Sequence, residues 1–138
     1  MALDVGTKRI GVAVADPSGT FGLPIATITR SNKRDDLACI KGYLDEYGVD
    51  VLVIGDPITL GGERGAAAAA LDAFVESVRG IFAGPIHRVD ERLTTAQATK
   101  SLIAADVSRK KRRAVVDRMA AALILETFLA RRRNEPAQ

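Results

Sequence analysis

Near its start the chain reads Leu3-Asp4-Val5-Gly6-Thr7-Lys8-Arg9-Ile10-Gly11-Val12-Ala13-Val14-Ala15, two short apolar runs separated by a polar turn that contains glycine. This pattern predicts two antiparallel strands, 3–5 and 10–15, joined as a hairpin. A further apolar run over 23–28 follows Pro17-Ser18-Gly19, and its Pro24 suits the beginning or the edge of a strand. The sequence therefore predicts three strands, linked by turns, at the start of the fold.

The rest of the chain alternates between helical and strand patterns. Apolar residues at helical spacing between 37 and 47 follow a capping residue, Asn32, and Gly48 marks the end of that helix. The remaining predicted elements are a strand over 51–54, a helix over 66–82, a strand over 86–89, a helix from Thr94 to about 105 and a long helix from Ser108 to about 133. This order indicates an α/β fold in which a mixed five-stranded sheet, three antiparallel strands and then parallel strands, is flanked by helices.

Length and composition limit the classes of protein that the sequence can encode. A chain of 138 residues has room for one domain, so we expect a single domain over 1–138. The longest apolar runs are too short to cross a bilayer, and the first residues form a predicted strand rather than a secretion signal. We therefore expect a cytoplasmic protein without a membrane partner. The one cysteine, Cys39, lies in a helical pattern among apolar residues, and we expect it to pack in the core.

Positive charge is concentrated in the second part of the chain. Residues 1–87 contain 8 Lys or Arg against 11 Asp or Glu, whereas residues 88–138 contain 12 against 6. A basic half in a protein with a pI near 9.3 is typical of proteins that bind phosphates. The charge distribution is consistent with a nucleic-acid partner.

Asp4 is the first candidate for a functional residue, because it lies inside an otherwise apolar strand. A buried carboxylate without a partner costs several kcal/mol, so something must compensate its charge. A bound cation would do so. The alternatives are a salt bridge to an internal Arg or Lys, or a cap on the turn at Gly6.

Two later positions offer further carboxylates. Asp90 and Glu91 directly follow a predicted buried strand, where α/β sheets commonly place their sites, although a polar loop would look the same. Asp117 lies at the edge of the apolar stripe of the last helix, where it either faces its own protein or pairs with Arg113 or Arg118. Carboxylates from a first strand, a later strand end and the last helix would together suit Mg²⁺ or Mn²⁺, which prefer oxygen ligands.

Other kinds of site are disfavoured. The single histidine, His87, lies within a predicted strand, which excludes a histidine-rich metal site and a Ser-His-Asp triad. The glycine-rich segment 6–11 joins two strands and lacks the Gly-Lys-Ser/Thr ending of a P-loop, so we expect no nucleotide cofactor. The basic run 109–113 begins a helix, where cations oppose the helix dipole; contact with phosphates would explain it, and a solvated face is the alternative.

Taken together, three segments resemble the YqgF/RuvX family over nearly the whole chain. These are Ala2-Leu3-Asp4-Val5-Gly6-Thr7-Lys8-Arg9-Ile10-Gly11-Val12-Ala13, then Asp90-Glu91-Arg92-Leu93-Thr94-Thr95, and Val116-Asp117 followed by alanines. The resemblance implies a ribonuclease H-like fold akin to that of Holliday junction resolvases. It also implies a metal-dependent nuclease, a hydrolase of phosphodiester bonds that matures the 5′ end of pre-16S rRNA in ribosome biogenesis, or alternatively resolves branched DNA in recombination and repair.

Carried onto this chain, the resemblance assigns Asp4, Glu91 and Asp117 as catalytic residues and ligands of Mg²⁺ or Mn²⁺, with Asp90 beside Glu91. Asp56 departs from the family, which usually has an apolar or aromatic residue between Gly55 and Pro57, so it either adds a ligand or faces solvent. The expected contacts with flanking phosphates are Lys8, Arg9, Arg92, Lys110, Lys111, Arg112 and Arg113.

Two alternatives stay open beside rRNA processing. A junction resolvase needs two active sites and therefore a homodimer. A ribosome-assembly factor would keep the fold and bind nucleic acid without cutting it.

Overall fold

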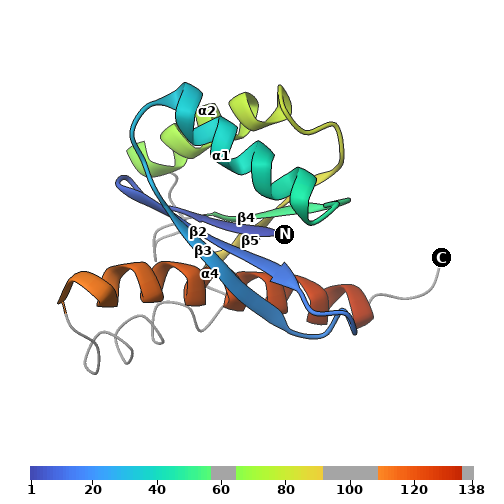
Figure 1. The fold of residues 1–138 in the computed structure, drawn as a ribbon. Helices are drawn as coiled ribbons and strands as arrows, with labels where there is room; N and C mark the ends of the chain where they lie inside the picture. Colours follow the sequence, from blue (N-terminus) through green and yellow to red (C-terminus); the bar gives the residue numbers. More distant parts are fainter. Residues whose placement is uncertain (57–64, 92–108, 135–138) are drawn as a thin grey trace.

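The computed structural model describes residues 1–56, 65–91 and 109–134, and in the last range it describes side chains from residue 117 onward. The elements in chain order are β1 Ala2–Val5, β2 Arg9–Ala15, β3 Gly22–Thr29, α1 Lys33–Glu46, β4 Leu52–Asp56, α2 Ala66–Arg79, β5 Ile86–Asp90 and α4 Arg109–Asn134. Each agrees with a predicted element to within a few residues (Figure 1). The helix predicted from Thr94 lies outside the described residues.

The strands form one mixed sheet in the order β3-β2-β1-β4-β5. β1 pairs with β2, and β2 with β3, in antiparallel fashion, and Asp4 lies opposite Gly11. β1 with β4, and β4 with β5, pair in parallel. The predicted sheet of three antiparallel strands followed by parallel strands is confirmed, and β1 occupies its centre.

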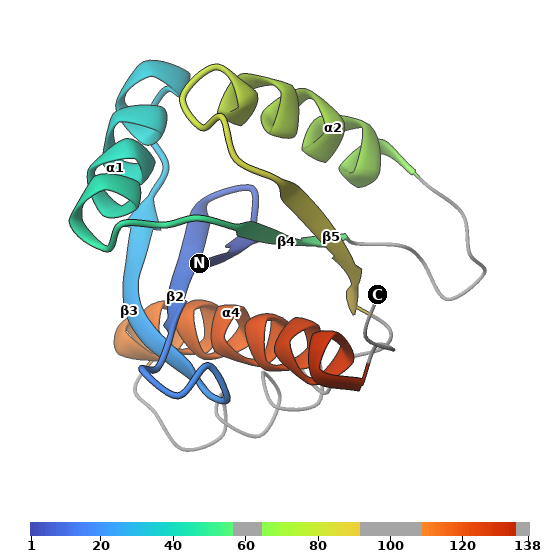
Figure 2. The ribbon, with the colours of Figure 1, turned by 90° about the vertical axis from the view of Figure 1, so that its right-hand side faces the viewer.

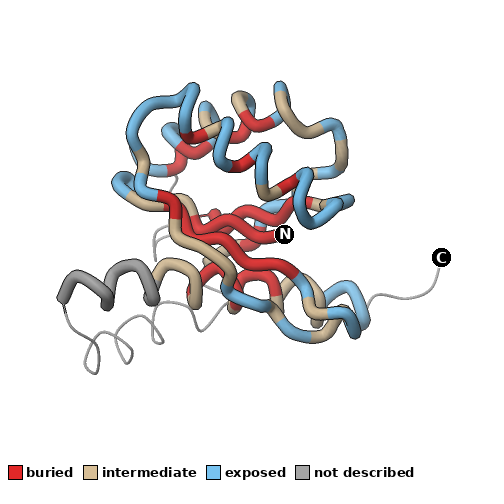
Figure 3. Tube along the Cα trace, viewed as in Figure 1, coloured by how far each residue is buried: buried red, intermediate tan, exposed pale blue. Residues whose placement is uncertain are grey.

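Helices cover the two faces of the sheet unequally. α1 and α2 lie on one face, and the long helix α4 lies across the other (Figures 1 and 2). Each face has its own apolar cluster. Leu3, Ile10 and Ile54 belong to the cluster under α1 and α2, whereas Ala2, Ala13 and Val53 belong to the cluster under α4. Figure 3 shows the buried residues concentrated in the strands and on the inward sides of the helices.

Helix α1 begins and ends as the sequence predicts. Asn32 accepts a hydrogen bond from the backbone N–H of Asp35, and Gly48 takes a positive φ of 55° just beyond the end of the helix. The prediction for Cys39 is wrong, because its side chain is exposed. The inward face of α1 is instead formed by Asp36, Ile40 and Leu44, one helical turn apart.

No helix among the described residues is both long and apolar enough to span a membrane.

Candidate functional site

Asp4 is a buried charge at the centre of the sheet. Asp4 is 6% exposed, although it lies only one position from the end of β1. Side chains alternate between the two faces of a strand, and Ala2 packs under α4, so Asp4 also faces α4. The site therefore lies between the sheet and the last helix.

A glycine on β2 lets α4 approach the sheet beside Asp4. Gly11 is the residue paired with Asp4, and a Cβ atom there would lie 1.9 Å from the carbonyl oxygen of Asp117. Only glycine permits so close an approach of two backbones. The segment of α4 that carries Asp117 therefore lies directly against the sheet beside Asp4.

A second glycine has the same effect on the other side of Asp4. Leu3 pairs with Ile54 in the parallel ladder, so the next residues along, Asp4 and Gly55, lie side by side. A Cβ atom on Gly55 would lie 2.8 Å from Oε1 of Glu91. The space that a side chain would fill is thus taken by the Glu91 carboxylate together with Cδ1 of Ile124 from α4, on the same face as Asp4.

The structure consequently gathers the three predicted catalytic acids on one face of the sheet. Asp4 comes from β1, Glu91 follows β5 directly, and Asp117 comes from α4. The acids could be predicted from the sequence, whereas the roles of Gly11 and Gly55, whose lack of a side chain lets the acids approach one another, were not predicted. Glycine at two inward-facing strand positions was the available signal, since glycine weakens a strand unless something must come close.

Asp117 makes an ion pair that was not predicted. Its Oδ2 accepts a hydrogen bond from Nε of Arg9 at 2.7 Å, and both side chains are partly buried. The expected alternatives were helical neighbours, Arg113 and Arg118. Arg9 reaches Asp117 because it faces α4 from β2, two residues before Gly11. One of the predicted phosphate-binding cations is therefore already bound to a predicted catalytic acid.

Asp56 and Asp90 lie on the opposite face of the sheet. The two residues are paired at the ends of β4 and β5. Because side chains alternate between the two faces of a strand, Asp56 and Asp90 face the same side as Ile54 and Arg88, which is the side covered by α1 and α2. Nη1 of Arg88 lies 3.9 Å from Oδ2 of Asp56 and 2.5 Å from Oδ1 of Asp72 on α2. The structure does not bring Asp56 or Asp90 together with Asp4.

The other predicted cations are located only in part. Lys8 is exposed in the turn between β1 and β2. Arg92 lies outside the described residues. Lys110, Lys111, Arg112 and Arg113 belong to the first turns of α4, on the side of Asp117 nearer the beginning of that helix, and only their backbone is described.

The acids provide the right donor atoms for a hard divalent cation. Carboxylate oxygens on one face of a sheet are the ligands that Mg²⁺ and Mn²⁺ prefer. No group of three or more His, Cys, Asp or Glu side chains within the described residues is arranged to hold a metal ion. The three carboxylates therefore have the donor chemistry of such a cation, but they are not arranged as a ligand set, and Asp117 is bound to Arg9.

The RuvX family model, described as a Holliday junction resolvase, matches residues 1–131 of this chain. The chain belongs to the RuvX family. Relatives of this RuvX-family chain include a protein of Geobacillus kaustophilus (strain HTA426), 45% identical over 135 residues that cover 96% of this chain and 98% of the relative. A protein of Moorella thermoacetica (strain ATCC 39073 / JCM 9320) is 45% identical over 131 residues, which cover 95% of this chain and 94% of the relative. Both carry the name "Putative pre-16S rRNA nuclease".

Solved structures show the same fold at low sequence identity. The RuvX-family chain resembles Thermus thermophilus RuvC in complex with a Holliday junction substrate, with a TM-score of 0.58 and 13% identity over 96% of this chain and 94% of that chain. A second structure of Thermus thermophilus RuvC matches with a TM-score of 0.51 and 12% identity, over 95% of this chain and 93% of that chain. The predicted ribonuclease H-like fold is confirmed.

Proposed function

We propose that this RuvX-family protein is a metal-dependent nuclease that hydrolyses phosphodiester bonds during 5′-end processing of pre-16S rRNA. The observation that carries the proposal is the placement of Asp4 between two glycines, whose open positions admit the Glu91 carboxylate and the backbone at Asp117. The names of the full-length relatives favour precursor rRNA as the substrate. The proposal includes one catalytic domain over 1–138 and a cytoplasmic location.

Asp4, Glu91 and Asp117 are the residues that would hold Mg²⁺ or Mn²⁺. When bound, such a cation supplies an activated water and charge stabilisation at phosphorus. The protein itself contributes position: burial keeps Asp4 in one place in the sheet, and the close approach at Gly11 fixes α4 beside it. Lys8 and the cations at the start of α4 would orient the phosphates that flank the scissile bond.

Cleavage by the purified protein tests the proposal. End-labelled precursor 16S RNA and a four-way DNA junction are each incubated with Mg²⁺, Mn²⁺ or EDTA. We expect RNA cleavage that EDTA abolishes and that Asp4→Asn lowers by at least ~10²-fold, because a ligand of the reacting centre is lost. Asp45→Asn is the matched control, since Asp45 is exposed and, among the described residues, forms a salt bridge only with Lys41 on the surface of α1. Equal cleavage by Asp4→Asn and Asp45→Asn would remove Asp4 from the mechanism.

Junction resolution is the second candidate function, favoured by the description of the family model. It requires two active sites in a homodimer that cut both strands symmetrically. Symmetric nicks in the junction, with sedimentation as a dimer on the junction, would establish it. Binding of RNA without cleavage under any metal condition would instead make the protein an assembly factor.

A further inference from the structure

A pocket lies on the face of the sheet opposite the carboxylates, at the same end of β1. It has a volume of about 520 Å³ and lies between α1 and α2. Thr7, in the turn that follows β1, and Arg30, which follows β3, belong to its wall. The pocket and the carboxylate site therefore share one structural boundary, the turn between β1 and β2.

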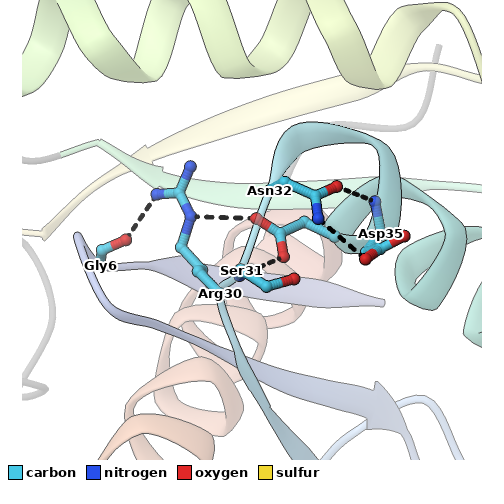
Figure 4. Close-up of polar contacts among 6 residues, drawn as sticks. Gly6, Arg30, Ser31, Asn32 and Asp35 are labelled. Carbon is cyan, nitrogen blue, oxygen red and sulfur yellow. Dashed lines mark hydrogen bonds and ion pairs between the residues drawn. The ribbon is translucent and has the colours of Figure 1, made fainter.

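Arg30 is held rigidly in this wall. Its Nη1 donates to the carbonyl oxygen of Gly6 at 2.7 Å (Figure 4), and its Nε lies 3.6 Å from Oδ2 of Asp36. Asp36 is itself only 4% exposed and accepts a hydrogen bond from the backbone N–H of Ser31. The guanidinium also lies 5.5 Å from the centroid of the Phe74 ring. Such contacts pre-organise an arginine for recognition of an anion.

The guanidinium has donors left over for a ligand. In Figure 4 its second terminal nitrogen points away from both Gly6 and Ser31, toward α2. No acceptor for this nitrogen is seen in the part of the chain that the structure describes. Lys33, exposed at the first position of α1, adds a second cation to the same pocket. The acid in the wall, Asp36, is already engaged by Arg30 and Ser31, so the vacant polar positions favour an anion.

The remaining wall is apolar and comes mainly from α2. Leu37 of α1 and Ala70, Ala73 and Phe74 of α2 form this part of the wall. Small alanine side chains leave the space open, and the volume lies in the range that holds a ligand the size of a nucleotide. The pocket thus combines an anion site with an apolar slot.

We propose that this pocket binds one nucleotide of the nucleic-acid strand, with its phosphate on Arg30 and Lys33 and its base against Ala70, Ala73 and Phe74. The inference rests on the proposed function, because a strand cut near Asp4 reaches the pocket by passing over the turn at Gly6 and Thr7. The pocket would then act as a subsite that fixes the register of the strand relative to the carboxylates. A free nucleotide offers the same chemistry, and the experiment separates the two sources.

The test uses Ala73→Leu, which fills the pocket and leaves the contacts of Arg30 intact. Ala69→Leu makes the same change at an exposed position of α2 that does not line the pocket. Binding of a short single-stranded RNA to the full chain is measured by titration calorimetry in EDTA, with nuclear magnetic resonance to map the shifted residues. We expect Ala73→Leu to bind the RNA about tenfold more weakly, the loss expected for one bound base, and Ala69→Leu to bind it as the original chain does. The RNA should also shift the resonances of Phe74 and Ser77.

Adenosine monophosphate is the second probe. Equal RNA affinity of the two variants, without shifts at Phe74 or Ser77, would overturn the subsite and leave Arg30 as a support for the turn. Tight binding of the mononucleotide that RNA fails to displace would overturn the assignment to the strand. Because EDTA prevents metal-dependent cleavage, these outcomes are independent of whether the protein is a nuclease. A chain that cuts no substrate can still show the difference between the variants.

Discussion

At the level of single residues, the site depends on the absence of side chains at Gly11 and Gly55, the two residues beside Asp4. Gly11→Ala would place a methyl group 1.9 Å from the carbonyl oxygen of Asp117, so α4 must move away from β2. We expect a loss of about 1–3 kcal/mol in the free energy of unfolding, together with loss of cleavage. Urea denaturation gives the first quantity. Gly42→Ala is the control: nothing lies within 4 Å of its added Cβ in the middle of α1, so it should stabilise by about 1 kcal/mol.

The ion pair of Arg9 with Asp117 leads to a second expectation. Arg9→Gln frees the Asp117 carboxylate, and we expect the affinity for Mn²⁺ to rise several-fold, as suits a partly exposed pair worth about 1 kcal/mol. Calorimetry or electron paramagnetic resonance of Mn²⁺ measures this without any substrate. Lys8→Gln removes the same charge from the exposed turn without touching Asp117. If both variants bind Mn²⁺ as the original chain does, the pair does not compete with the cation.

Functional residues could be predicted from the sequence only where local chemistry marks them. Asp4 could be found because a charge in an apolar strand is costly wherever the strand ends up. The partner of Asp117 could not, because Arg9 is 108 residues away and only the packing of α4 on β2 brings the two together. Asp36 was not predicted as a structural or functional residue, and the structure buries it against Arg30.

At the level of elements, the loop between β2 and β3 is organised by one acid. The Asp16 carboxylate accepts hydrogen bonds from the Ser18 hydroxyl at 2.6 Å and from the backbone N–H groups of Thr20 and Phe21 at 2.9 Å. These bonds, the one from Ser18 first, lower the pKa of Asp16 from 3.8 to about 2.

The pH dependence of this loop follows from the sign of that shift. A carboxyl group whose pKa is lowered in the folded state contributes stability that is present above about pH 4 and is lost as the pH falls toward 2. We expect the amide resonances of Thr20 and Phe21 to titrate with a midpoint near 2 and their hydrogen exchange to accelerate below it. Asp16→Asn should remove this titration. A midpoint near 4 in the original chain would contradict the hydrogen-bonded arrangement.

Predicted elements agreed with the structure where the sequence carries strong local signals. The hairpin of β1 and β2, the Asn32 cap of α1 and the unbroken apolar run of β4 all lie where expected. The prediction that Cys39 packs in the core was wrong, because an apolar residue next to the inward-facing stripe of a helix need not belong to that stripe. Periodicity also could not show that Asp56 and Asp90 face away from Asp4, since that depends on the register of three strands.

At the level of the whole molecule, the basic second half of the chain is expected to bind phosphates through the start of α4. Replacing Lys110 and Lys111 by Gln should reduce the slope of log affinity against log salt by roughly 1 to 2, the value for two lost phosphate contacts. Fluorescence anisotropy with single-stranded RNA over a range of salt measures the slope. Arg132 and Arg133, exposed at the other end of α4, provide the control pair. An unchanged slope in the Lys110 and Lys111 variant would assign that run to a solvated face.

The packing of α4 has a consequence for the synthesis of the protein. Residues 117–134 cover one face of β1, β2 and β3, which are made first, and they also carry the last of the three acids. While the chain is still on the ribosome, that apolar face stays uncovered until α4 has emerged from the exit tunnel. Under the proposed function, a nascent chain therefore acquires activity toward RNA only once Asp117 has emerged and packed against β2.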